Sequence, residues 1–263
     1  MAKPRNYKTE AVVVRQSPLG EADRIITMLS PEHGQIRAVA KGVRRATGRL
    51  TGHLELLNRV EVSLAEGRNL DVVTEAQCLD GFPALRNDLD RVSAGMFLAE
   101  LVDGFAMPEG HGPPDAHGRE MYALLVQTLN RLDQGRPVDV LLPYFQIRVL
   151  ALSGLSPELT VCVECGRALE QRSHAYSAGG GGIACPDCVT GAPGPFLSIS
   201  VGAIKLLRFF QSRSLDEAVE LDAPPGVLTE ASKLLDAHLR HHLDREIRSS
   251  RFLKTLNREP TGA

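Results

Sequence analysis

Four cysteines in two close pairs constrain this chain more than any other feature. Cys162 and Cys165 form one Cys-x2-Cys pair, Cys185 and Cys188 form a second, and nineteen residues separate the pairs. Two such pairs joined by a compact loop have the ligand spacing of a tetrahedral four-cysteine zinc site. Four protein ligands leave no open coordination position, so we expect one structural Zn²⁺ per chain and no catalytic metal. Two disulfides, or redox-active cysteine pairs, are the alternatives.

The composition is that of an ordinary globular protein, with 43% hydrophobic and 24% charged residues among 263. That length accommodates two domains and a small module. The N-terminal segment lacks the long apolar core of a signal peptide, and no apolar run approaches the length of a membrane span. We therefore expect a soluble, cytoplasmic protein without membrane contact. Its fifth cysteine, Cys78, is expected to be a small buried or semi-buried residue and not a nucleophile.

Positive charge is concentrated at one end of the chain. Residues 1–60 hold eleven Lys or Arg against five Asp or Glu, although the whole chain carries a formal charge of -2. A basic end on an acidic body predicts an anionic partner that binds at that end.

Residues 8–80 have the pattern of β-strands. Short apolar or β-branched runs at 11–15, 24–29, 35–41, 60–64 and 70–76 are separated mostly by turns that contain Pro or Gly. Consecutive strands of this kind, mostly without a helix between them, predict a small closed barrel. The OB-fold is the five-stranded barrel that most often binds single-stranded nucleic acid, so we assign residues 1–80 to an OB-fold domain.

From about residue 84 onward, apolar residues recur at helical spacing. One series is Leu85, Leu89, Val92 and Met96, and further series run through 122–132, 138–149 and 228–247. Prolines separate these series, and the cysteine module interrupts them. We expect an α+β multidomain chain, with the OB-fold barrel at 1–80, the first part of an α-helical bundle at 81–158, the four-cysteine zinc finger at 159–192 and the second part of the bundle at 193–263.

A row of cations follows the third predicted strand. Arg37 and Lys41 share a strand face, and more arginines crowd the loop beyond Gly42. Phosphates are bound by such a row of long cations, so we predict nucleic-acid binding here, with electrostatics outweighing base stacking. A solvated basic loop is the alternative. The candidate DNA-binding residues are Arg15, Arg24, Arg37, Lys41, Arg44, Arg45 and Arg49.

A second basic stripe lies near the C-terminus. Spacings of three or four residues place Arg248, Arg251 and Lys254 roughly along one helix face, and Arg240 lies upstream. A solvated face beside a helix C-terminus explains this pattern at least as well. The functional interpretation is a second nucleic-acid contact or a dock for an acidic peptide.

The sequence contains no catalytic constellation that we recognise. His238, His241 and His242 have no carboxylate or cysteine arrangement that would complete a metal site. Gly179–Gly182 lacks the ending of a phosphate-binding loop, and no GxSxG, HExxH, DFG or dinucleotide fingerprint is present. We therefore do not expect an enzyme.

The N-terminal segment resembles a known family. Residues 9–45 read TEAVVVRQSPLGEADRIITMLSPEHGQIRAVAKGVRR, which is similar to the N-terminal domain of RecO, the bacterial recombination mediator. The four-cysteine module falls where many members carry a zinc finger, and the ending SSRFLKTL also resembles the family. The loop after Arg45 reads ATGRL, where members often have a Ser–Arg pair.

The resemblance implies a DNA repair and recombination mediator. Such a protein would bind single- and double-stranded DNA and anneal complementary strands without ATP. It would act with RecR, and in many bacteria RecF, to load RecA onto gaps. It would contact the acidic C-terminal tail of the single-stranded DNA-binding protein through its helical domain, in the cytoplasm and near the nucleoid. The rival from another class is an OB-fold and zinc-ribbon factor that binds RNA or assists transcription; a zinc-dependent nuclease and a pure protein scaffold are further rivals.

Overall fold

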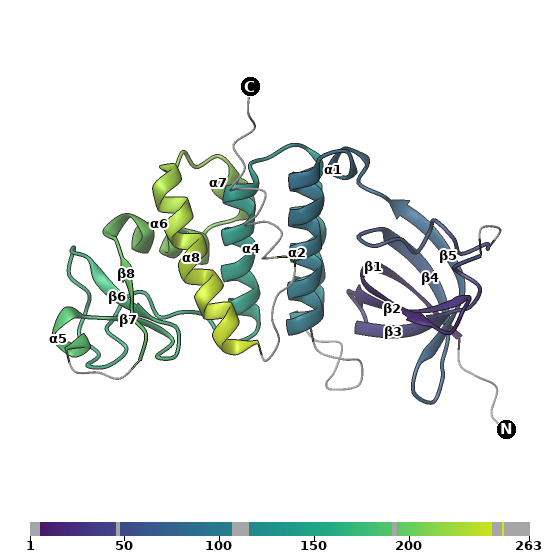
Figure 1. Ribbon diagram of the computed structural model, residues 1–263, viewed down its shortest axis with the longest axis horizontal. Helices are drawn as coiled ribbons and strands as arrows, with labels where there is room; N and C mark the ends of the chain where they lie inside the picture. The colour runs from purple at the N-terminus through teal and green to yellow at the C-terminus, as the bar shows by residue number, and fades with distance from the viewer. Residues whose placement is uncertain (1–5, 46–47, 107–115, 191–193, 244–248, 250–263) are drawn as a thin grey trace. The chain divides into compact units, whose positions relative to one another are not determined.

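The computed structural model describes residues 6–45, 48–106, 116–190, 194–243 and 249 (Figure 1). The chain divides into two compact units, Met1–Gly135 with Ser249–Ala263, and Arg136–Arg248. Among the described residues, no helix combines the length and the apolar character that crossing a membrane requires.

A closed five-stranded barrel begins the first unit. Its strands lie in the order β1-β2-β3-β5-β4, and all neighbours are antiparallel except β3 and β5. The predicted OB-fold barrel is thereby confirmed. The strands are β1 (Asn6–Leu19), β2 (Asp23–Ser30), β3 (Gly34–Ala40), β4 (Arg59–Ala65) and β5 (Asp71–Asp80).

Every second side chain of a strand such as β4 points into the barrel and forms its core. In β4, Val60, Val62 and Leu64 are fully buried, and the residues between them are only partly buried. Small residues such as Ala11 and Ala38 share this core with larger ones, which suits the narrow interior of a five-stranded barrel.

Helices α1 (Pro83–Arg86), α2 (Leu89–Phe105) and α3 (Ala116–Asp133) complete the first unit. The predicted helical series from Leu85 breaks before Leu89, because the side chain of Asp88 caps α2 by accepting a hydrogen bond from the backbone of Arg91. The predicted apolar face of α2 is wrong in part, since Leu89 and Met96 are exposed. The helix instead buries a face with several small residues, comprising Ser93, Ala94, Gly95, Phe97, Leu98, Ala99, Leu101 and Val102.

Two contacts fix the helices on the barrel. Leu57, in a left-handed conformation with φ 71, packs against Gly95 of α2, where an added Cβ would lie 2.7 Å from Leu57 Cδ1. Tyr122 of α3 donates a hydrogen bond to Glu10 of β1, which also pairs with Arg59 of β4. The hydrogen bond from Arg59 holds the pKa of Glu10 below its ordinary value, although burial opposes the shift.

The second unit consists of a helical core and a small three-stranded sheet. Helix α4 packs against α6, α7 and α8, and the sheet has the order β7-β6-β8 (Figure 1). The elements are α4 (Val138–Leu152), β6 (His174–Ser177), β7 (Gly182–Ala184), α5 (Pro186–Val189), β8 (Leu197–Ile199), α6 (Val201–Ser212), α7 (Leu215–Val219) and α8 (Pro225–His242). The four-cysteine module thus interrupts the helices, as predicted.

Candidate metal centre and nucleic-acid interface

The four cysteines converge on one point. Their Sγ atoms all lie within 4.8 Å of one another, and the Sγ atoms of Cys165 and Cys185 are 3.9 Å apart. That separation is about twice the length of a disulfide bond, and all five cysteines of the chain are free thiols. The predicted grouping of the four cysteines is confirmed, and they do not form the two disulfides of the alternative interpretation.

Each cysteine pair sits in a tight backbone turn. In the first turn, the N–H of Gly166 donates to the carbonyl of Cys162 at 2.9 Å, and Gly166 has φ 71, which favours glycine. In the second, the N–H of Cys188 donates to the carbonyl of Cys185 at 3.0 Å. The N–H of Cys185 also donates to Cys162 Sγ at 3.2 Å, so backbone polarity stabilises negative charge on that sulfur.

The surroundings of the cysteines shift their pKa values in different directions. Burial acts to raise the pKa of Cys162, but backbone N–H donors, first that of Cys185, outweigh it and lower that pKa. The Arg167 side chain lowers the pKa of Cys165 to about 6. The pKa of Cys188 rises to about 12, through its hydrogen bonds first with Cys185 and then with Cys165. Sulfurs this close ionise together only around a cation, so the donor set fits a soft metal ion that takes four thiolates.

The core around the cysteines is small. Among the described residues, its buried cluster consists of Cys162, Ala184 and Cys185, with partly buried side chains such as Phe196 packed against it. Tyr176 and Ile183 of the module are also buried. A core of this size needs a metal, or docking on a larger body, to hold one structure.

A buried histidine docks the module on the helices. His238 of α8 is 1% exposed, and its Nε2 lies 3.0 Å from the carbonyl oxygen of Leu155. A carbonyl only accepts, so Nε2 carries the proton, and Nδ1 accepts from the hydroxyl of Tyr176 in β6 at 2.8 Å. Burial lowers the pKa of His238 to about 4. Among the described residues, the group that could hold a metal ion consists of the four cysteines and includes no histidine of α8.

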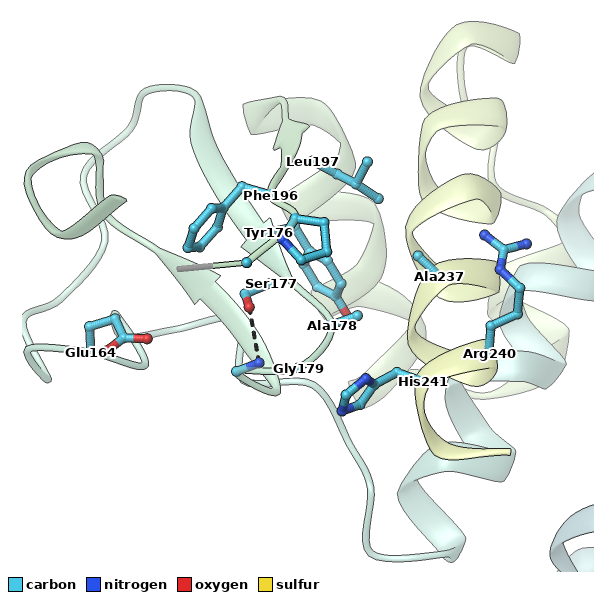
Figure 2. Close-up of a pocket in the computed structure, with 13 residues that line it drawn as sticks. Glu164, Tyr176, Ser177, Ala178, Gly179, Phe196, Leu197, Ala237, Arg240 and His241 are labelled. Carbon is cyan, nitrogen blue, oxygen red and sulfur yellow. Dashed lines mark hydrogen bonds between the residues drawn. The ribbon is translucent and has the colours of Figure 1, made fainter. Parts of the chain in front are cut away.

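A pocket of about 610 Å³ is lined by residues of the module, of the segment that follows it and of α8 (Figure 2). Its walls are mainly apolar, with Tyr176, Phe196 and Ala237 among them. Figure 2 shows His241 reaching from α8 toward Gly179, where an added Cβ would lie 3.4 Å from the imidazole. Arg240 also borders the pocket, is exposed, and makes no ion pair with a described residue. The other predicted residues of this stripe, Arg248, Arg251 and Lys254, lie outside the described residues.

At one end of the barrel, the β1–β2 turn supports the basic loop. Asp23 accepts a hydrogen bond from the N–H of Gly42 at 2.7 Å. The backbone N–H of Arg44 donates to the carbonyl of Ala22 at 3.0 Å, and its Nη1 donates to the carbonyl of Gly20 at 3.2 Å. These bonds hold the start of the loop in one conformation.

Four predicted cations project from this compact loop. All four are exposed, and none forms an ion pair with any residue in the described part of the chain. Thr51 closes the loop by donating to the carbonyls of Val43 and Arg45 at 3.0 and 2.9 Å. The structure therefore brings together exposed cations whose charge no carboxylate among the described residues offsets, namely Lys41, Arg44, Arg45 and Arg49.

The other three predicted cations differ. Arg37 is exposed on the outer face of β3, and Arg24 donates a hydrogen bond to Gln16 at 2.7 Å. Arg15 is paired with Asp103 of α2 at 3.4 Å, so its charge is already partly offset. Sequence reasoning also missed an aliphatic row across the same outer face, where Ile25 pairs with Val39, Val39 pairs with Val72, and all three are partly exposed.

Comparisons with known proteins cover nearly the whole chain. The family model described as Recombination protein O N terminal matches residues 1–82, and the model described as Recombination protein O C terminal matches residues 86–251. The DNA repair protein RecO of Roseiflexus sp. (strain RS-1) is 40% identical over 251 residues, which are 95% of this chain and 86% of that protein. Proteins of the same name from Dehalococcoides mccartyi and Cutibacterium acnes are each 36% identical, over 97% and 94% of this chain and 98% of each relative. The chain therefore belongs to the RecO family of DNA repair proteins.

Proposed function

We propose that this chain binds single- and double-stranded DNA at the basic end of its barrel and anneals complementary strands without ATP. With RecR, and with RecF where it is present, it helps to load RecA onto DNA coated by single-stranded DNA-binding protein. The observation that carries the proposal is the unpaired cationic loop, in which Lys41, Arg44, Arg45 and Arg49 are all exposed.

The mechanism follows from the charge of the loop. The four cations displace the counterions that are condensed on the DNA phosphates, so affinity comes from counterion release and falls as salt rises. Neutralised strands approach one another closely, and base pairing between them supplies the sequence specificity. No step requires a catalytic group of this chain, which agrees with a mediator and not an enzyme.

The metal is proposed to be one structural zinc ion, held by Cys162, Cys165, Cys185 and Cys188. Bound zinc would supply a rigid tetrahedral link between the two cysteine turns. The chain's own residues then carry that rigidity into the helices, because Tyr176 of the module donates its hydrogen bond to His238 of α8. Zinc is thus needed for the fold of the second unit and not for the annealing step.

We propose one of two partners for the C-terminal basic stripe. It binds the acidic tail of the single-stranded DNA-binding protein, or it makes a second contact with DNA. Arg240 supports this assignment, since it is exposed beside the pocket at the end of α8 and has no acidic partner among the described residues. We also propose that the chain consists of an OB-fold domain at 1–80, a first helical part at 81–158, the zinc finger at 159–192 and a second helical part at 193–263. Its proposed location is the cytoplasm, in association with the nucleoid.

Matched double variants test the DNA-binding site. Lys41→Ala/Arg45→Ala removes two loop cations, and Lys8→Ala/Arg68→Ala removes one Lys and one Arg from the opposite end of the barrel. Each lost phosphate contact lowers the salt slope for single-stranded DNA by about 0.7, so the loop variant should lose about 1.4 units of slope. Between 50 and 200 mM salt, wild-type affinity should then fall about sevenfold more than that of the loop variant.

Fluorescence anisotropy with labelled oligonucleotides measures these slopes. Equal slopes for the wild-type chain and the loop variant would remove this loop from the DNA site. Selective binding of RNA, without annealing of DNA, would instead favour an RNA-directed factor.

A further inference from the structure

Arg167 spans the two cysteine pairs. Gly166 reverses the chain just after Cys165, and this turn brings the next side chain back over the sulfurs. Arg167 Nε donates to Cys165 Sγ at 3.3 Å, and its Nη2 lies 4.0 Å from Cys185 Sγ. The guanidinium therefore contacts a sulfur from each pair.

Asp187 holds the other side of the guanidinium. Its Oδ2 lies 3.3 Å from Arg167 Nη2, and Asp187 belongs to the second cysteine turn. The planar guanidinium of Arg167, which follows the first cysteine turn, thus contacts the second turn at two places. These are the sulfur of Cys185 and the carboxylate of Asp187. Lysine, with a single ammonium on a flexible stem, does not reproduce this geometry.

The negative charge of the metal centre would be offset by the guanidinium of Arg167. Four thiolates around a divalent ion carry a net charge of −2, and no other side-chain cation contacts these sulfurs within the part of the chain that the structure describes. Groups that hydrogen-bond to metal ligands fix their orientation, and their loss typically weakens metal binding 10- to 100-fold.

We propose that Arg167 is a positioning residue of the metal centre: it holds the two cysteine pairs together and offsets the negative charge of their sulfurs. This role rests on the proposed metal-binding function of the four cysteines. An ordinary surface ion pair is the competing interpretation, since the side chains of Arg167 and Asp187 are 65% and 62% exposed. Exposed pairs contribute little to folding, so that interpretation predicts no effect on the metal.

Zinc competition on the full chain separates the two interpretations. Purified wild-type protein and Arg167→Gln are each loaded with one zinc ion and titrated with a chromophoric chelator. We expect zinc affinity to fall about tenfold in Arg167→Gln, at the lower end of the usual range because the guanidinium is exposed. Zinc release to excess chelator should accelerate. Arg167→Lys should lie between the two, because it keeps the charge and loses the planar guanidinium.

Arg172→Gln is the matched control. Arg172 belongs to the same module and pairs with Glu170 at 3.0 Å, without contacting a cysteine. Its zinc affinity should equal that of the wild-type chain. Arg167→Gln with unchanged zinc affinity and release rate would overturn the positioning role while leaving the metal site intact. A folded wild-type chain that takes up no zinc would overturn the metal assignment itself, and this role with it.

Discussion

Replacing Gly95 with alanine tests how the helices are fixed on the barrel. Gly95 lies inside α2, where glycine is about 1 kcal/mol less favourable than alanine, so propensity alone predicts stabilisation. The new methyl carbon would, however, lie 2.7 Å from Leu57 Cδ1 and 3.6 Å from both Leu129 Cδ2 and Leu85 Cδ1. The first distance is well inside van der Waals contact, so a neighbour must move.

Leu57 has little freedom to move. It is 2% exposed, its φ of 71 fixes the backbone, and its N–H donates to the carbonyl of Val13 at 2.8 Å. Overpacking of a core costs about 1–3 kcal/mol, which exceeds the gain in helix propensity. We expect Gly95→Ala to lower the free energy of unfolding by about 1 kcal/mol, the difference between the two effects.

Urea unfolding followed by circular dichroism measures this change, and Gly226→Ala is its control. Gly226 also lies in a helix, α8, but an added Cβ there would have no neighbour within 4 Å. The control should be neutral or more stable than the wild-type chain. A Gly95→Ala protein as stable as the control would refute the packing argument. A double-mutant cycle with Leu57→Ala should recover a coupling of about 1 kcal/mol.

Three further predictions concern ionisable side chains and the metal centre. Because the folded pKa of His238 is about 4, the unfolded chain takes up its proton first as pH falls below 6.5. Between pH 7 and 5, wild-type stability should therefore fall about 2 kcal/mol more than that of His238→Gln in urea titrations; equal losses would contradict this. Cys185→Ser should lose its zinc and unfold the module, whereas Cys78→Ser should keep both, by elemental analysis and thermal denaturation. A folded Cys185→Ser protein that binds DNA and its protein partners but no longer anneals strands would contradict a purely structural metal. Glu10→Gln should lower stability by about 1 kcal/mol in a thermal melt, because the charge of Arg59 then lacks its partner.

Local patterns predicted the barrel and the metal centre. Strand alternation in β4 depends only on which neighbours are apolar, and the cysteine spacing depends only on turn geometry. Both signals are complete within short segments of sequence. The helical series from Leu85 was less informative, because the packing of α2 depends on small residues that allow Leu57 to approach Gly95.

Contacts between residues far apart in the chain could not be predicted from local sequence patterns. Arg15 was grouped with the DNA-binding cations, but its partner Asp103 is 88 residues away and lies on a helix. His238 carried no sign of its buried position, because Tyr176 and Leu155 reach it from distant segments. Arg167 did carry a local signal, as a cation two residues beyond a cysteine ligand, but its reach to Cys185 required the folded module.

Annealing of two labelled complementary DNA strands, without ATP and across a salt series, is the first test of the proposed function. We expect annealing that weakens as salt rises, is reduced in Lys41→Ala/Arg45→Ala, and is preserved in Lys8→Ala/Arg68→Ala. Absence of annealing and of DNA binding by the folded wild-type chain at 50 mM salt, a concentration at which phosphate contacts are strong, would contradict the proposed function.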